Sequence, residues 1–314
     1  MSPTASALLM IACCPAFGQH TPSQDFTLRV NSDLVVLEAG VTDPRGANVP
    51  DLKLADFRVY EDGRLQTIRQ FSAEERPATI ALVVDNSGSM RPKRPEVITA
   101  ALGMIEASNP DDEVFVVNFN DSATLGLPPE MPFSGDIAEL RRALSIGRAQ
   151  GRTALNDAMI LAIEHLAQGK WDKKALLLVS DGGDNSSQHT SKDVLAAIEH
   201  AQAIVYTIGL FDPEDPDRNP GALRRLTDIS GGKAYLPERT DEIVGICQSI
   251  AHDIRSRYTL AYVPSAESHP GVVHRIKVVA RSDSGTKLLV RTRTSYAIRP
   301  DSTAALEDRT PPAH

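Results

Sequence analysis

The chain has 314 residues, enough for one large domain or two smaller ones, because single hydrophobic cores stop growing at about 250–300 residues. Hydrophobic residues make up 41% of it and charged residues 24%, which is typical of a soluble globular protein. The net charge of −8 works against nonspecific binding to nucleic acid, which needs a basic surface, so we expect no nucleic-acid partner.

The first 18 residues are typical of a secretory signal peptide. The apolar segment from Ala5 to Ile11 leads to small residues, and we expect cleavage after Gly18, although no positive charge precedes the segment. The mature protein would then be periplasmic or secreted. A lipid anchor on Cys13 and a packed or disordered N-terminus are the alternatives. Beyond this segment no apolar run approaches the roughly 18 residues of a membrane span, so we expect none.

The rest of the chain changes pattern twice. Residues 25–75 alternate strand-like runs with turn residues, which indicates antiparallel strands. Over 76–257, Val/Ile/Leu-rich strands alternate with helices, which indicates a mostly parallel sheet covered on both faces. The helices are expected near 94–107, 135–146, 154–168, 191–201, 221–229 and 240–256. Residues 258–299 return to strands, with a hairpin predicted at Ser284-Gly285, and 300–314 read as a disordered tail.

These patterns predict an α/β fold with a doubly wound, Rossmann-like sheet and a second, smaller domain. Neither flanking set of strands buries enough surface to be stable alone. We therefore predict that 25–75 and 258–299 pair into one β-sandwich-like domain, into which the α/β domain is inserted.

The segment IALVVDNSGSM, residues 80–90, runs from a buried strand into polar residues. Asp85 ends the strand, and Ser87 and Ser89 follow at alternate positions. A polar turn is one interpretation, because Asp, Asn, Ser and Gly are common in turns. A cluster of oxygen ligands for a hard cation is the other.

Two further segments carry oxygen groups that favour the second interpretation. LLLVSDGGDN ends a later strand on Asp181, and parallel strands that flank the switch point of a doubly wound sheet share one crevice at their carboxyl ends. GRTALNDA places Thr153 just before a helix, where its hydroxyl is either a metal ligand or an N-cap.

The segments DNSGSM, GRT and VSDGGDN, in this order, resemble the metal-ion-dependent adhesion site (MIDAS) of von Willebrand factor type A domains over about residues 78–256. The flanking strands are similar to those of secreted bacterial proteins that carry this domain. The resemblance implies that Ser87, Ser89 and Thr153 are direct ligands. It also implies that Asp85 and Asp181 act mostly through water or hydroxyl hydrogen bonds.

The resemblance also implies a divalent cation, Mg²⁺ with Mn²⁺ or Ca²⁺ as substitutes, and a protein partner that supplies an Asp or Glu to it. It further implies that the last helix shifts when the partner binds, here 240–256 with its stripe Ile243, Ile246, Ile250 and Ile254. We expect a cell-adhesion or protein-interaction module that is not an enzyme. The alternatives are a Mg²⁺-dependent phosphohydrolase-like enzyme, since an Asp after a parallel strand can be a nucleophile, and a scaffold whose metal is structural.

Other candidates are weaker. The loop from Asp215 to Gly221 has Pro220 where a calcium loop needs glycine, so we predict a solvated acidic loop. The eight histidines show no metal-ligand spacing, and His165, His200 and His252 are expected on helix surfaces or half-buried. Cys247 follows helical apolar spacing and is expected to be a buried thiol without a disulfide.

Overall fold

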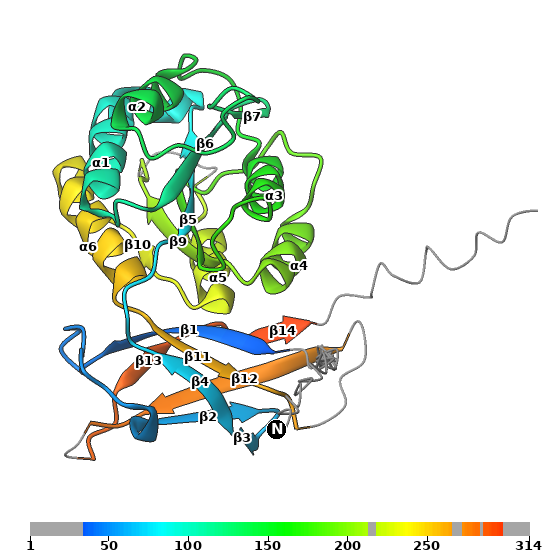
Figure 1. The fold of residues 1–314 in the computed structure, drawn as a ribbon. Helices are drawn as coiled ribbons and strands as arrows, with labels where there is room; N and C mark the ends of the chain where they lie inside the picture. Colours follow the sequence, from blue (N-terminus) through cyan, green and yellow to red (C-terminus); the bar gives the residue numbers. More distant parts are fainter. Residues whose placement is uncertain (1–33, 213–217, 266–271, 283–284, 298–314) are drawn as a thin grey trace, which may run out of the picture. The chain divides into compact units, whose positions relative to one another are not determined.

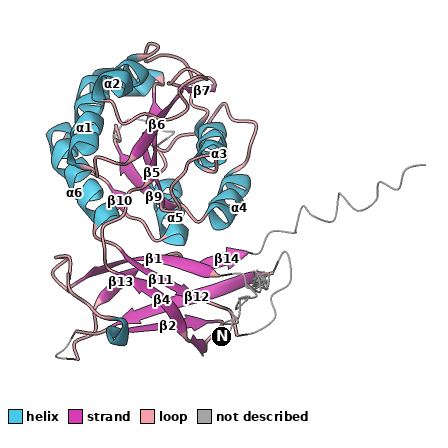
Figure 2. Cartoon of the chain, in the orientation of Figure 1, coloured by secondary structure: helices cyan, strands magenta, loops and turns pink. Residues whose placement is uncertain are grey.

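The computed structural model describes residues 34–212, 218–265, 272–282 and 285–297. The predicted signal peptide, the tail and residues 215–217 of the acidic loop lie outside these ranges, as does Ser284 of the predicted hairpin. Figure 1 shows the described elements along the chain, and Figure 2 shows that the helices gather around one sheet while the remaining elements are mostly strands.

A six-stranded sheet forms the centre of the α/β part, in the order β10-β9-β8-β5-β6-β7. Every residue of β5 is buried, as Val/Ile/Leu-rich central strands require. All neighbours pair in parallel except β6 and β7, which are antiparallel. The strands are β5 (Thr79–Asp85), β6 (Glu113–Phe119), β7 (Ala123–Leu125), β8 (Lys174–Ser180), β9 (Ile204–Gly209) and β10 (Ala234–Tyr235).

Helices cover both faces of this sheet. Helix α1 packs against α2 and α6, whereas α4 packs against α3 and α5, so each face carries three helices (Figure 1). The α-helices are α1 (Arg94–Ala107), α2 (Ile137–Ser145), α3 (Leu155–Leu166), α4 (Ser191–Ala201), α5 (Pro220–Ser230) and α6 (Ile243–Arg255). Three short 3₁₀ helices are η1 (Leu54–Asp56), η2 (Gly88–Lys93) and η3 (Thr240–Glu242). The predicted α/β, doubly wound fold class is confirmed.

Two four-stranded antiparallel sheets, in the orders β13-β1-β11-β4 and β14-β12-β2-β3, combine strands from before and after the α/β segment. Their inward residues form a second hydrophobic core, separate from that of the α/β part. The strands are β1 (Val35–Thr42), β2 (Phe57–Glu61), β3 (Arg64–Gln66), β4 (Ile68–Ser72), β11 (Tyr258–Tyr262), β12 (Val273–Ala280), β13 (Leu289–Arg291) and β14 (Ser295–Ala297). The division into domains at residues 76 and 257 stays a prediction.

Two side-chain predictions have different outcomes. Cys247 is buried in the α/β core with Ile243, Ile250 and Ile254 of α6, and burial raises the pKa of its thiol to about 12. The expectation for His165 is wrong, because this side chain is buried against the rings of Phe115 and Phe133. The Nε2 atom of His165 lies 2.9 Å from the backbone carbonyl oxygen of Pro132, so this ring nitrogen has a hydrogen-bond partner inside the core.

Candidate metal site

The order of the central sheet brings the two predicted carboxylates into one crevice. Strand β5 lies between β6 and β8, and the chain leaves β5 toward β6, so the strand order reverses between β5 and β8. Asp85 ends β5 and Asp181 directly follows β8, with Val84 opposite Val179 in the register. Both carboxylates are almost fully buried. They lie where doubly wound sheets bind ligands, at the carboxyl ends of the strands beside the switch point.

Four of the five predicted site residues form one chain of hydrogen bonds. The Ser87 backbone N–H donates to Asp85 Oδ1 at 2.8 Å. The Oγ atoms of Ser87 and Ser89 lie 3.1 Å apart, and Ser89 Oγ donates to Asp181 Oδ2 at 2.6 Å. Two hydroxyls therefore lie side by side, with a buried carboxylate at each end.

The loop that carries Thr153 is tethered to the loop after β5. The Gln150 N–H donates to the Asn86 carbonyl oxygen at 2.9 Å, and the Gly88 N–H donates to the Gly151 carbonyl oxygen at 3.2 Å. Thr153 is buried, and its backbone N–H donates to Asn185 Oδ1 at 3.0 Å. Three backbone segments thus meet at the crevice.

The alternative N-cap function of Thr153 is not what the structure shows. Helix α3 begins at Leu155 with Ala154 at its N-cap, and no side chain caps it there. Across the described ranges, no hydrogen bond joins the Thr153 hydroxyl to Ser87, Ser89 or the two carboxylates. The Thr153 side chain therefore does not cap helix α3.

Burial shapes the electrostatics of the crevice. Desolvation raises the pKa of Asp85 to about 6. The hydrogen bonds from Ser180 and Ser87 counteract this, and the nearby charge of Asp181 adds to it. Burial thus disfavours the ionised form of Asp85, and a bound cation would favour it.

Sequence reasoning missed two groups that position the site. Ser180, the last residue of β8, is fully buried and donates its hydroxyl to Asp85 Oδ2 at 2.6 Å. Asp121 accepts from the Arg152 N–H at 2.9 Å and so holds the loop before Thr153. The sequence shows Ser180 as a hydroxyl that ends the apolar run of residues 175–179, but this pattern does not set the direction of its side chain.

The comparisons with known proteins show which proteins this chain is similar to. Residues 80–183 match the family model of the von Willebrand factor type A domain. An uncharacterized protein, sll0103, of Synechocystis sp. is 33% identical over 146 residues, covering 45% of this chain and 34% of that protein. Inter-alpha-trypsin inhibitor heavy chain H4 of Bos taurus is 24% identical over 201 residues, covering 57% of this chain and 22% of that protein. The chain thus spans about a third or less of the length of these relatives.

Two solved structures share the fold. von Willebrand factor type A from Catenulispora acidiphila gives a TM-score of 0.51 at 15% identity, over 88% of this chain and 76% of that chain. Proximal thread matrix protein 1 from the mussel byssus gives a TM-score of 0.50 at 16% identity, over 62% of this chain and 51% of that chain. The fold is therefore that of these proteins, and residues 80–183 match the von Willebrand factor type A domain, as the sequence motifs predicted. Such domains are protein-interaction modules, often metal-dependent and in general not enzymes.

Proposed function

We propose that the protein is a metal-dependent binding module in which a divalent cation, Mg²⁺ or in its place Mn²⁺ or Ca²⁺, bridges the crevice to an Asp or Glu of a protein partner. Ser87, Ser89 and Thr153 would hold the ion directly. Asp85 and Asp181 would act through water or hydroxyl hydrogen bonds. The observation that carries this proposal is the pair of adjacent hydroxyls beside two buried carboxylates: the Ser89 hydroxyl donates to Asp181, and the Ser87 backbone N–H donates to Asp85.

The spacing of the two hydroxyls suits an octahedral ion. Neighbouring ligands of an octahedron with oxygen at about 2.0–2.1 Å lie about 2.8–3.0 Å apart. The Oγ atoms of Ser87 and Ser89 are 3.1 Å apart, so both fit beside one Mg²⁺ with little movement. All the groups offered are oxygen atoms, which hard cations prefer over nitrogen or sulfur.

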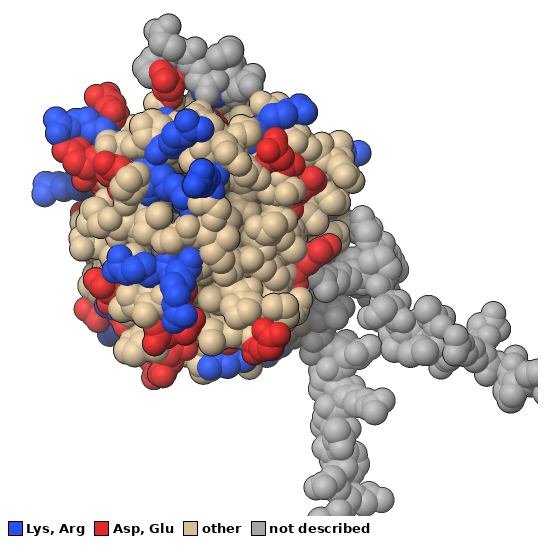
Figure 3. All heavy atoms as spheres, turned by 90° about the horizontal axis from the view of Figure 1, so that it is seen from above, with Lys and Arg blue, Asp and Glu red and all other residues tan. Residues whose placement is uncertain are grey.

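The charge arrangement favours an acidic partner. Neutral hydroxyls leave the cation's charge incompletely compensated, and a partly desolvated crevice strengthens its attraction for a carboxylate. The face in Figure 3, which looks down on the end where α2 and β7 lie, carries charges of both signs around a broad uncharged area. Local attraction by the ion, rather than a uniformly basic face, would thus provide the specificity.

The alternative of a phosphohydrolase-like enzyme gains no support from the crevice. A nucleophilic carboxylate needs a free oxygen to attack with. Both oxygens of Asp85 accept hydrogen bonds, from the Ser87 N–H and from Ser180 Oγ. These hydrogen bonds favour a positioning function for the Asp85 carboxylate.

The proposal places the protein outside the cytoplasm, on the strength of the signal-like residues 1–18. No helix in the described ranges is both long enough and apolar enough to span a bilayer. Anchoring through Cys13 stays the alternative to free secretion.

The test is capture of partners from an extracytoplasmic extract by the immobilised protein, with Mg²⁺ and with EDTA. We expect a partner that is retained in Mg²⁺ and released by EDTA. Thr153→Ala should weaken its binding while Mg²⁺ still binds, because the hydroxyl pair remains. Changing the partner's contacting carboxylate to an amide should also abolish binding. Full binding in EDTA, or undiminished binding of the amide partner, would leave the ion only a structural function.

A further inference from the structure

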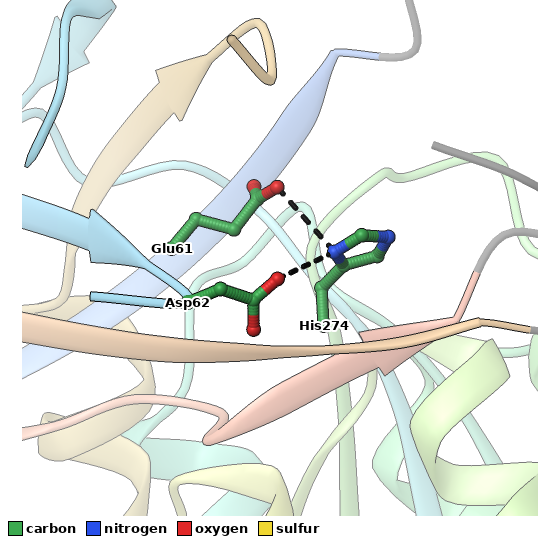
Figure 4. Close-up of side chains that lie close together, drawn as sticks. All are labelled: Glu61, Asp62 and His274. Atoms are coloured by element: carbon green, nitrogen blue, oxygen red, sulfur yellow. Dashed lines mark hydrogen bonds and ion pairs between the residues drawn. The ribbon is translucent and has the colours of Figure 1, made fainter. Parts of the chain in front are cut away.

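A second group of metal-binding side chains lies in the antiparallel sheets, outside the crevice. It consists of Glu61, the last residue of β2, Asp62 in the turn that follows, and His274 of β12. One ligand atom from each lies within 4.8 Å of the others. Figure 4 shows Nδ1 of the imidazole facing both carboxylates.

Strand register fixes these positions. Strands β2 and β12 are antiparallel with Glu61 opposite Ile276, so His274, two residues away, shares the same face of the sheet. That face is the interior one, because the buried residues of β12 alternate with exposed ones. A glutamate and a histidine thus occupy inward positions that the strand pattern assigns to apolar side chains, and such departures tend to mark functional or strained sites.

Each carboxylate has one oxygen held and the other directed at the imidazole. Glu61 Oε2 accepts from the hydroxyls of Tyr262 at 2.7 Å and Tyr296 at 3.1 Å, while Oε1 lies 3.6 Å from His274 Nδ1. Asp62 Oδ1 accepts from the Arg275 N–H at 2.9 Å, while Oδ2 lies 2.8 Å from Nδ1. Supporting hydrogen bonds of this kind orient the ligands of metal sites.

The charges of the group are not balanced by basic side chains. No Lys or Arg in the described part of the chain forms an ion pair with Glu61 or Asp62, and the contacts of that type come from His274 alone. Only 3% of Glu61 is exposed to solvent, and burying a carboxylate without a cation costs free energy of folding. Asp62 is half-exposed, which gives an ion a route from solvent.

The distances suit a small tetrahedral ion. Ligands at about 2.0–2.1 Å from Zn²⁺ lie about 3.3–3.4 Å apart at the tetrahedral angle. The separations of 2.8 Å and 3.6 Å from Nδ1 bracket this value.

The geometry points to a Zn²⁺ site formed by Glu61 Oε1, Asp62 Oδ2 and His274 Nδ1, with water as the fourth ligand, in the antiparallel part of the protein. Binding displaces any proton on Nδ1, so affinity falls as the pH decreases. The ion joins the β2–β3 turn to β12 and neutralises the two carboxylates. This site is independent of the proposed binding crevice, whose groups are all oxygen atoms.

The test is calorimetric titration of the full chain with Zn²⁺, in excess Mg²⁺ to occupy the oxygen-only crevice. The wild type should bind one Zn²⁺ at this site. Asp62→Asn and His274→Gln should each weaken binding by about 100-fold or more, because each removes a ligand, and Tyr262→Phe should weaken it by roughly tenfold. X-ray absorption at the zinc edge should show one nitrogen among oxygen ligands.

Two matched controls separate this site from others. His252→Gln removes an exposed histidine of α6, and Asp181→Ala removes a carboxylate of the crevice. Both should retain wild-type Zn²⁺ affinity. Asp62 is half-exposed, so Asp62→Asn tests the site even if His274→Gln fails to fold. Absence of Zn²⁺ binding in the wild type, or undiminished affinity in Asp62→Asn, would show that the three side chains form only a hydrogen-bonded cluster.

Discussion

Replacing Asp253 of α6 by alanine should destabilise the protein by about 3–5 kcal/mol, the usual cost of leaving a buried charge without its partner. Asp253 Oδ2 accepts from Tyr206 at 2.6 Å and from Arg257 Nη2 at 3.1 Å, and Oδ1 accepts from Arg291 Nη2 at 2.7 Å. The Arg257 side chain is completely buried. Without Asp253 this guanidinium would retain only backbone carbonyl oxygens and the Tyr206 hydroxyl as acceptors.

The assay is urea unfolding of the wild type and the variant, followed by circular dichroism. Asp241→Ala is the control, because its partner Arg239 is also exposed and such surface pairs contribute little. We expect no measurable change for the control. A loss below about 1 kcal/mol for Asp253→Ala would refute the reasoning, since it would mean that Arg257 is not a buried charge that depends on this carboxylate.

The same carboxylate makes stability depend on pH. Burial by itself raises the pKa of Asp253, but Arg257 and Arg291 outweigh it, so the pKa in the folded state lies below its usual value. A lowered folded-state pKa adds stability that is complete above the unfolded-state pKa of about 3.9 and is lost as the pH falls through the folded value. Wild type and Asp253→Ala should therefore converge in stability in strong acid.

Two further predictions concern the loop before Thr153 and the buried thiol. A Cβ on Gly151, whose φ is +83°, would clash with the Asp121 carboxylate that holds this loop, so Gly151→Ala should weaken Mg²⁺ binding by roughly tenfold. Gly147→Ala is the control, because Gly147 also has a positive φ, +77°, but a Cβ there would meet no atom within 4 Å. Unchanged Mg²⁺ affinity in both variants would contradict the proposal that Asp121 holds the loop before Thr153. Cys247 should resist thiol reagents at pH 8 until urea unfolds the protein, because burial raises its pKa to about 12; rapid labelling of the folded protein would contradict its burial.

The sequence was sufficient for the order of the central elements. Val/Ile/Leu-rich strands that alternate with amphipathic helices have few other arrangements, and α1 and α4 have the predicted bounds. Strand β7 was missed because three residues are too few to show an alternating pattern, and it forms by antiparallel pairing with β6. Its existence depends on a neighbour rather than on its own pattern.

The candidate sites differ in how far sequence could predict them. Asp85 and Asp181 end neighbouring parallel strands, so topology alone predicts that they meet. Ser180 was missed because its side-chain direction at the strand end depends on the pleat. His274 lies 212 residues from Asp62, and only the register of β2 and β12 brings the two together. No spacing along the chain reports such a pairing.

The most direct test of the binding crevice is calorimetric titration with Mg²⁺ of the wild type, Asp85→Ala and Asp181→Ala. The wild type should bind one Mg²⁺ in the crevice, and each variant should bind it roughly 10- to 100-fold more weakly, because Asp85 holds the Ser87 backbone and Asp181 holds the Ser89 hydroxyl. Asp241→Ala, which removes an exposed carboxylate, should match the wild type. Mg²⁺ affinity that stays unchanged in both Asp85→Ala and Asp181→Ala would contradict the assignment of the metal to this crevice.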